Sequence, residues 1–185
     1  MKTTAFFIVF MLLSQIVICQ NRSINIEQLF ITNNLNGKSV KLLTNEETLK
    51  NFGELITINA LAQNIHSEDY AKEYVFADIK IYTSTLGKIA SFETESENII
   101  IEKKGYFSIS PGILFLDLSK LFPHETQNAK LIHYGPNNEE FLCVKLNLSD
   151  FSQNLNKYVD IDYSLNLLFD VKTEVLVKAY IWIKP

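Results

Sequence analysis

Apolar and polar residues alternate along much of the chain, and this alternation predicts antiparallel strands. The predicted strands cover residues 74–83, 88–93, 99–103, 106–109, 141–148, 165–169 and 175–183. The last two are close enough along the chain to form a hairpin. Because strict alternation is typical of sheets with one buried and one open face, we expect other elements to cover the aliphatic face.

Two segments are predicted to be the helices that cover this face. Thr44 and Glu47 have the spacing of a capping box, in which the Thr44 hydroxyl accepts from the N–H of Glu47, and the predicted helix covers residues 45–52. Leucines at helical spacing predict a second helix over residues 114–122, which Pro123 ends. Predicted strands follow each of the two helices.

The repeated order of elements predicts an α+β fold made of two tandem helix-plus-antiparallel-strand repeats. The first repeat covers residues 20–110 and the second covers residues 111–185. Phe52 with Gly53, and Phe122 with Pro123, occupy equivalent positions at the ends of the two helices. The repeats are expected to form one antiparallel sheet with both helices on one face.

The segments 44–53 and 112–123, each followed by antiparallel strands, resemble the tandem helix-plus-sheet unit of β-lactamase inhibitory proteins. They are also similar to the small outer-membrane-assembly lipoproteins that share this unit. The resemblance covers most of residues 40–185 and implies the same fold and a general binding character, but no individual functional residue. The β-lactamase inhibitory proteins are cross-linked by disulfides, whereas this chain has one cysteine after the predicted signal peptide.

The N-terminal segment has the pattern of a secretory signal peptide, predicted over residues 1–19. Lys2 precedes an unbroken apolar run over residues 5–13, which is too short to span about 30 Å of hydrocarbon. Cleavage after Cys19 leaves Gln20 as the first residue, and a lipoprotein anchored through Cys19 is the alternative. The mature protein is therefore expected to be secreted or periplasmic, with no transmembrane segment after cleavage.

The composition changes this picture little, but it excludes some partners. The apolar fraction of 47% and the charged fraction of 21% are normal for a globular protein. The net charge of −4 argues against nucleic-acid binding, which needs a cationic surface. Arg22 is the only arginine among 17 basic residues, a bias that is typical of AT-rich bacteria with two membranes.

The sequence carries no pattern for catalysis or for a cofactor. It has no Gly-rich phosphate loop, no G-x-S-x-G, no H-E-x-x-H and no C-x-x-C. Cys143 lies in an apolar, strand-like run with no base nearby, so we interpret it as a buried thiol rather than a nucleophile. We therefore expect that the protein is not an enzyme and that it binds no metal or cofactor.

The remaining positive feature is the predicted open face of the sheet, where aromatic and lysine side chains gather. Its expected members are Tyr74, Phe76, Lys80, Tyr82, Phe141, Lys145, Lys178, Tyr180 and Trp182. Aromatic residues are enriched at interface centres, so this face is a candidate protein-binding surface. The alternative is that another segment covers these residues as ordinary core.

The combined pattern predicts an exported, non-enzymatic module that binds another protein or acts at the cell envelope. A small secreted hydrolase, with an acidic and histidine site dispersed over several loops, is one alternative. A structural envelope component is another. A deep polar pocket that holds a perturbed carboxylate beside a histidine would favour the hydrolase, and a broad exposed aromatic face would favour the binding module.

Overall fold

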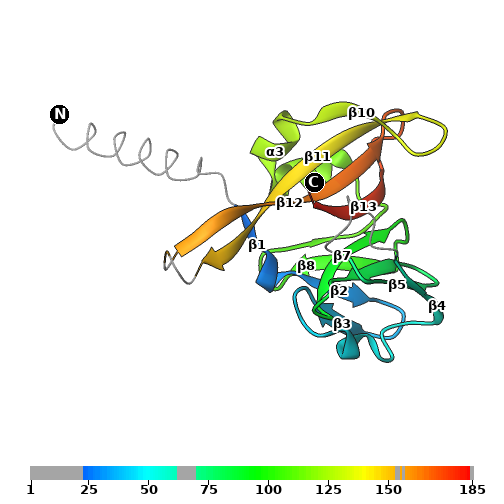
Figure 1. The fold of residues 1–185 in the computed structure, drawn as a ribbon. Coiled ribbons are helices and arrows are strands. Elements are labelled where there is room, and N and C mark those ends of the chain that lie inside the picture. The colour runs from blue at the N-terminus through cyan, green and yellow to red at the C-terminus, as the bar shows by residue number, and fades with distance from the viewer. Residues whose placement is uncertain (1–22, 62–69, 153–154, 156, 184–185) are drawn as a thin grey trace, which may run out of the picture.

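The computed structural model describes residues 23–61, 70–152, 155 and 157–183 (Figure 1). The predicted signal peptide, with its cleavage site between Cys19 and Gln20, lies outside the described residues. The strands are β1 (Ile24–Asn25), β2 (Phe30–Asn33), β3 (Lys38–Lys41), β4 (Leu55–Ala60), β5 (Lys72–Phe76), β6 (Lys80–Thr83), β7 (Ile89–Thr94), β8 (Ile99–Lys103), β9 (Phe107–Ile109), β10 (Lys130–Tyr134), β11 (Glu139–Ser152), β12 (Lys157–Asp170) and β13 (Leu176–Ile183). The helical elements are the 3₁₀-helices η1 (Ile26–Gln28) and η2 (Glu46–Leu49) and the α-helices α2 (Phe115–Leu121) and α3 (Pro123–Gln127).

The strands form two sheets, and this contradicts the predicted α+β fold with a single sheet. A nine-stranded sheet has the order β1-β11-β12-β13-β7-β6-β5-β4, with β10 also paired to β11, and a four-stranded sheet has the order β3-β2-β8-β9. The larger sheet is mixed rather than antiparallel, because β1 runs parallel to β11. Strands make up 54% of the described residues and helical elements 13%, so the fold is mostly β and is not built of helix-plus-strand repeats.

The larger sheet is completed by strands from both ends of the chain. Strands β1 and β7 precede residue 110, yet they pair with β11 and β13, which follow it. The junction between β7 and β13 is two residue pairs long, Thr94 with Ala179 and Glu93 with Tyr180. The pairing of the larger sheet therefore crosses the predicted boundary between the repeats at residue 110.

One continuous hydrophobic core lies between the larger sheet and the elements that cover it. Figure 1 shows the four-stranded sheet beside β4 to β7 in one half of the molecule, and α2 and α3 beside β10 to β13 in the other. Phe115 of α2 packs against Phe169 of β12, with ring centroids 5.3 Å apart. Phe122, after α2, packs against Phe107 of β9 at 5.2 Å, so the helix end also contacts the smaller sheet.

The first predicted helix, over residues 45–52, is wrong, because only the 3₁₀ turn η2 forms there. The Thr44 hydroxyl donates to the carbonyl of Lys41 at 2.6 Å and does not form the expected capping box. Asn51 has a positive φ of 67°, which is incompatible with a continuing helix. A segment this short is a marginal helix by itself, so its tertiary surroundings decide its conformation.

The second predicted helix is confirmed, although Pro123 has a further role. Helix α2 buries Leu118, and the N–H of Phe122 bonds the carbonyl of Leu118 at 2.9 Å. Pro123 follows as the first residue of α3, where its missing N–H is not needed. The chain therefore changes direction at Phe122 and continues as a second short helix.

The predicted strands are confirmed in part. Residues 99–103 form β8, and β12 pairs with β13 as the predicted hairpin. The strand predicted over residues 74–83 is wrong as a single strand, because the chain turns at Ala77 and Asp78 and forms β5 and β6. This turn is closed by the N–H of Phe76, which donates to the carbonyl of Ile79 at 2.9 Å.

Candidate functional site

Most residues of the predicted aromatic face do lie on one face of the larger sheet, which we call the outer face. The register of β6, β7, β13, β12 and β11 defines its central row, in which each residue is the direct cross-strand partner of the next. This row consists of Lys80, Glu93, Tyr180, Asn166 and Lys145. Alternation along the same strands adds Tyr82, Lys178 and Phe141. Trp182 of β13 is the cross-strand partner of Ser164 of β12. The side chain of Trp182 lies outside what the structure describes.

Tyr74 and Phe76 are not brought to this face. The turn between β5 and β6 pairs Tyr74 with Ile81, which is fully buried in the main core. Phe76 is also buried there, with its ring 5.6 Å from that of Phe52 in an edge-on contact. The reversal of the chain exchanges the two sets of alternating residues, so the even-numbered residues of β5 share the core face with the odd-numbered residues of β6.

The centre of the outer face is covered. Tyr180 and Lys178 each keep only 9% of their surface exposed. Tyr134 of β10 stacks on Tyr180 with ring centroids 5.5 Å apart. The Lys178 ammonium pairs with Glu93 at 2.6 Å and Glu95 at 3.1 Å. The role of the outer face in partner binding stays a prediction, and the structure makes its central residues part of the packing.

Burial and charge set the protonation of this cluster. Burial raises the pKa of Tyr180 above its ordinary value, and the same cause acts on Tyr82. Burial by itself lowers the pKa of Lys178, but the hydrogen bonds and charges of Glu93 and Glu95 outweigh it and raise the pKa overall. Both tyrosines therefore stay neutral and Lys178 stays charged at neutral pH. Buried Cys143 also stays a thiol, because burial raises its pKa.

The most exposed strand of the larger sheet is β4, which lies at its edge beside β5. All six of its residues are exposed, and Leu55, Ile56 and Ile58 expose 47%, 64% and 48% of their surfaces. The strand contains no charged residue and no proline, which are the usual protections of an edge strand. Within the described residues, β4 therefore presents an exposed apolar edge to which an extended chain can pair.

The backbone groups that point away from β5 on this edge can be assigned to residues. The N–H of Leu61 donates to the carbonyl of Ala71 at 3.0 Å, so Leu61 faces β5. Backbone groups alternate in direction along a strand, and the register continues without a shift from Thr57 to Ala60. The N–H and C=O groups of Ile58 and Ala60 therefore point away from β5, toward the open edge.

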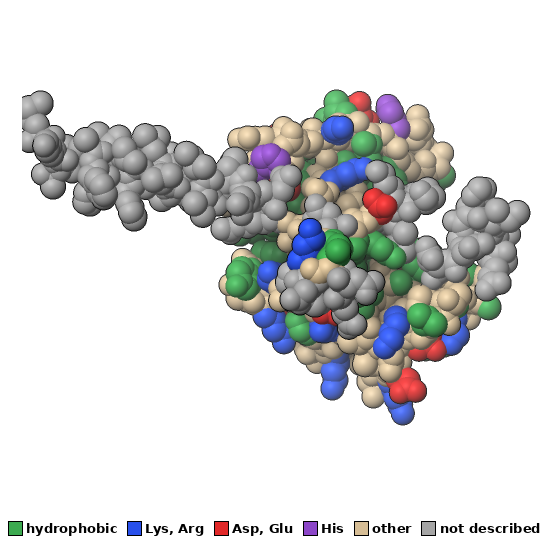
Figure 2. All heavy atoms as spheres, turned by 60° about the vertical axis from the view of Figure 1, so that its left-hand side comes forward, with side chains coloured by type: hydrophobic (Ala, Val, Ile, Leu, Met, Phe, Trp, Pro, Cys, Tyr) green, Lys and Arg blue, Asp and Glu red, His purple; other side chains and the backbone are tan. Residues whose placement is uncertain are grey.

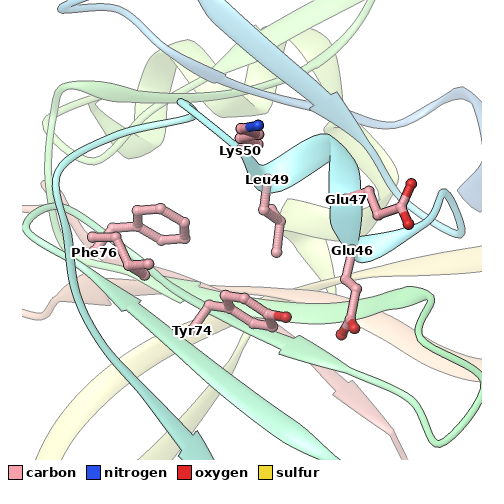
Figure 3. Close-up of a pocket in the computed structure, with 7 residues that line it drawn as sticks. Glu46, Glu47, Leu49, Lys50, Tyr74 and Phe76 are labelled. Carbon is pink, nitrogen blue, oxygen red and sulfur yellow. The ribbon is translucent and has the colours of Figure 1, made fainter.

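A pocket of about 500 Å³ opens beside β4, between η2 and the sheet (Figure 3). Its lining combines apolar and charged side chains from η2, β4 and β5. These are Glu46, Glu47, Leu49, Lys50, Leu55, Tyr74 and Phe76. Figure 3 shows Leu49 pointing from η2 toward the sheet, opposite Tyr74 and Phe76. The pocket therefore has an apolar floor and one acidic corner.

The acidic corner is held in place by a small network around Glu46. The Lys72 ammonium donates to the Glu46 carboxylate at 2.6 Å, and the Thr83 hydroxyl donates to its other oxygen at 3.2 Å. The hydrogen bond from Lys72 lowers the pKa of Glu46, although burial acts in the opposite direction. Burial and the contact with Glu46 raise the pKa of Tyr74. Glu46 is thus an ionised residue that is held in one position in the lining of the pocket.

Sequence reasoning missed both β4 and the pocket. The run of residues 55–60 is rich in apolar and β-branched residues, which is a strand signal. Its position at an edge, and the approach of η2 over Tyr74 and Phe76, depend on strand order and on the face exchange in β5. Only the tertiary arrangement supplies those two facts.

No group of three or more His, Cys, Asp and Glu side chains is placed to hold a metal ion within the described residues. Every buried side-chain N or O atom among them has a hydrogen-bond partner. None of the helices in the described part of the chain is long and apolar enough to cross a membrane.

Comparison of the chain with protein-family models, curated proteins and solved structures gives no match.

Proposed function

We propose that the protein is an exported, non-enzymatic binding module that takes up an extended segment of another protein along β4. The observation that carries this proposal is the edge strand itself, which is exposed along its whole length and carries three large apolar residues but no charge. Export rests on the signal peptide predicted over residues 1–19. The expected site of contact with the partner is therefore β4 and not the outer face.

Strand addition accounts for both features of this edge. An added strand gains affinity from main-chain hydrogen bonds, here to the free groups of Ile58 and Ala60, and specificity from pockets for alternate side chains. The added strand would place every second side chain on the face of Leu55, which lines the pocket. An apolar side chain of the partner therefore suits the floor formed by Leu49 and Phe76.

The test uses a library of random extended peptides displayed on phage and selected on the immobilised protein. We expect selected peptides to protect the amides of Ile58 and Ala60 from hydrogen exchange. Ile58→Pro removes a free-edge donor without removing a bond to β5, and it should weaken peptide binding at least about tenfold. Ile58→Thr keeps the donor and the β-branched shape, so it is the matched control.

Two results would contradict strand addition. One is the selection of no peptide. The other is equal binding of the selected peptides to Ile58→Pro and to the unaltered protein. Urea denaturation of both variants shows whether any loss of binding reflects unfolding instead of the missing donor.

A further inference from the structure

A second surface lies at one end of the four-stranded sheet and is independent of β4. Phe30 begins β2, and its direct cross-strand partners are Lys41 on β3 and Glu102 on β8. Just beyond Glu102, Lys103 ends β8, and the turn to β9 carries Lys104 and Tyr106. Strand pairing thus gathers three lysines and two aromatic rings, and we call Phe30, Lys41, Lys103, Lys104 and Tyr106 the basic–aromatic patch.

The side chains of this patch are arranged around the two rings. The Lys104 ammonium lies 4.7 Å from the ring centre of Phe30, and the Lys103 ammonium lies 4.4 Å from that of Tyr106. Tyr106 exposes 73% of its surface at the tip of the turn. The cations are therefore held at a surface that also offers apolar ring area.

Within the described part of the chain, no carboxylate forms an ion pair with a lysine of the patch. The ion pairs among the described residues use Lys72, Lys80, Lys120 and Lys178, and none involves a lysine of the patch. Glu102 is the acidic cross-strand neighbour, and it accepts a hydrogen bond from the Thr32 hydroxyl at 2.9 Å. Figure 2 shows lysine side chains, in blue, spread over the lower half of this view of the molecule, with acidic side chains, in red, among them. This surface is thus cationic although the chain has a net charge of −4.

We infer that the basic–aromatic patch docks on the surface of an anionic phospholipid bilayer. Charge complementarity requires an anionic partner. Lysine is a flexible point charge, which suits attraction to many mobile headgroups better than the fixed, two-pronged contact that arginine makes with a single phosphate. An exposed tyrosine with an apolar body and a polar tip suits the level of the lipid headgroups.

The start of the chain is also consistent with a bilayer at the basic–aromatic patch. β1 and η1 open the described fold and lead directly into Phe30. Four residues separate Cys19 from Ile24, which corresponds to a reach of at most about 18 Å between the two. A lipid on Cys19, the alternative processing route, would therefore hold the bilayer near this end of the molecule. A lipid anchor combined with a basic patch supplies the two signals that stable membrane anchoring takes.

The test measures sedimentation of residues 20–185, which contain the whole core, with vesicles of phosphatidylglycerol mixed with phosphatidylcholine. We expect binding that weakens as salt rises and that is absent with phosphatidylcholine alone. Replacing all three lysines of the patch by Gln should weaken binding about a hundredfold, since each lysine near an anionic surface contributes about fivefold. The control replaces Lys130, Lys145 and Lys172 by Gln, which makes the same change of charge at exposed positions outside the patch.

Three results would overturn the inference. They are absence of binding to the anionic vesicles at low salt, an equal loss in the control variant, and full binding by the variant without the three lysines. Tyr106→Ala should weaken vesicle binding less than the triple replacement does. If the patch binds the soluble polyanion dextran sulfate but not the vesicles, its partner is an anionic polymer and the bilayer assignment is wrong.

Discussion

The ammonium group of Lys178 lies 2.6 Å from the carboxylate of Glu93 and joins the two halves of the larger sheet. Glu93 is on β7 and Lys178 on β13, and the ladder between these strands is only two residue pairs long. A side-chain bond at so short a junction reinforces a place where few backbone pairs hold the sheet together. The pair is also largely shielded, because the Lys178 side chain is only 11% exposed.

Replacement of Lys178 by Met should therefore lower the free energy of unfolding by about 2 kcal/mol. Removal of the cation leaves the partly buried Glu93 carboxylate, and the more exposed Glu95 carboxylate, without the charge that pairs with both. Lys120→Met is the control, since its ion pair with Asp117 is exposed and should contribute less than about 0.5 kcal/mol. Urea denaturation measures both, and equal losses would show that burial does not strengthen the Lys178 pair.

Tyr180 should contribute to stability through its packing. Tyr180→Ala removes a ring that is buried and stacked on Tyr134, so we expect a loss of about 3 kcal/mol. Tyr180→Phe keeps the ring and should cost under about 1 kcal/mol. The exposed Tyr106, replaced by Ala, should change stability by less than about 0.5 kcal/mol. A stable Tyr180→Ala protein would show that this part of the outer face is open in solution.

The network around Glu46 should make stability depend on pH in the acidic range. The pKa of Glu46 in the folded protein is lowered below its ordinary value of 4.5. Its contribution is therefore fully present above about pH 4.5 and is lost as the pH falls through the lowered folded value. The stability difference between the protein and Glu46→Gln should shrink in that window. Urea midpoints measured from pH 7 downward test this, and a constant difference would contradict it.

Local sequence patterns determined several elements of this fold. Residues 99–103 alternate and form β8, and the leucine spacing after Gly112 forms α2, since each pattern buries one side whichever neighbour covers it. The alternation in β13 also placed Lys178 and Tyr180 on the same face. These features depend only on the spacing of apolar residues along each segment, which can be read directly from the sequence.

Alternation failed where the backbone departs from regular pairing. The turn at Ala77 and Asp78 exchanged the faces of β5 and moved Phe76 into the core. A register shift between Leu168 and Phe169 likewise places Leu176 in the main core and packs Val177 against the cluster around Tyr180. A displacement of one residue reverses every later side chain, so a period of two predicts faces only between such points.

Tertiary structure alone decided the strand order, and with it the candidate sites. The sequence determined that residues 55–60 are apolar and β-branched, but their place at an edge follows from which strands found partners. In the same way, Lys41 is far along the chain from the adjacent Lys103 and Lys104, and it meets them because β3, β2 and β8 pair side by side. Pairing between distant strands depends on their combined burial, and no local pattern records it.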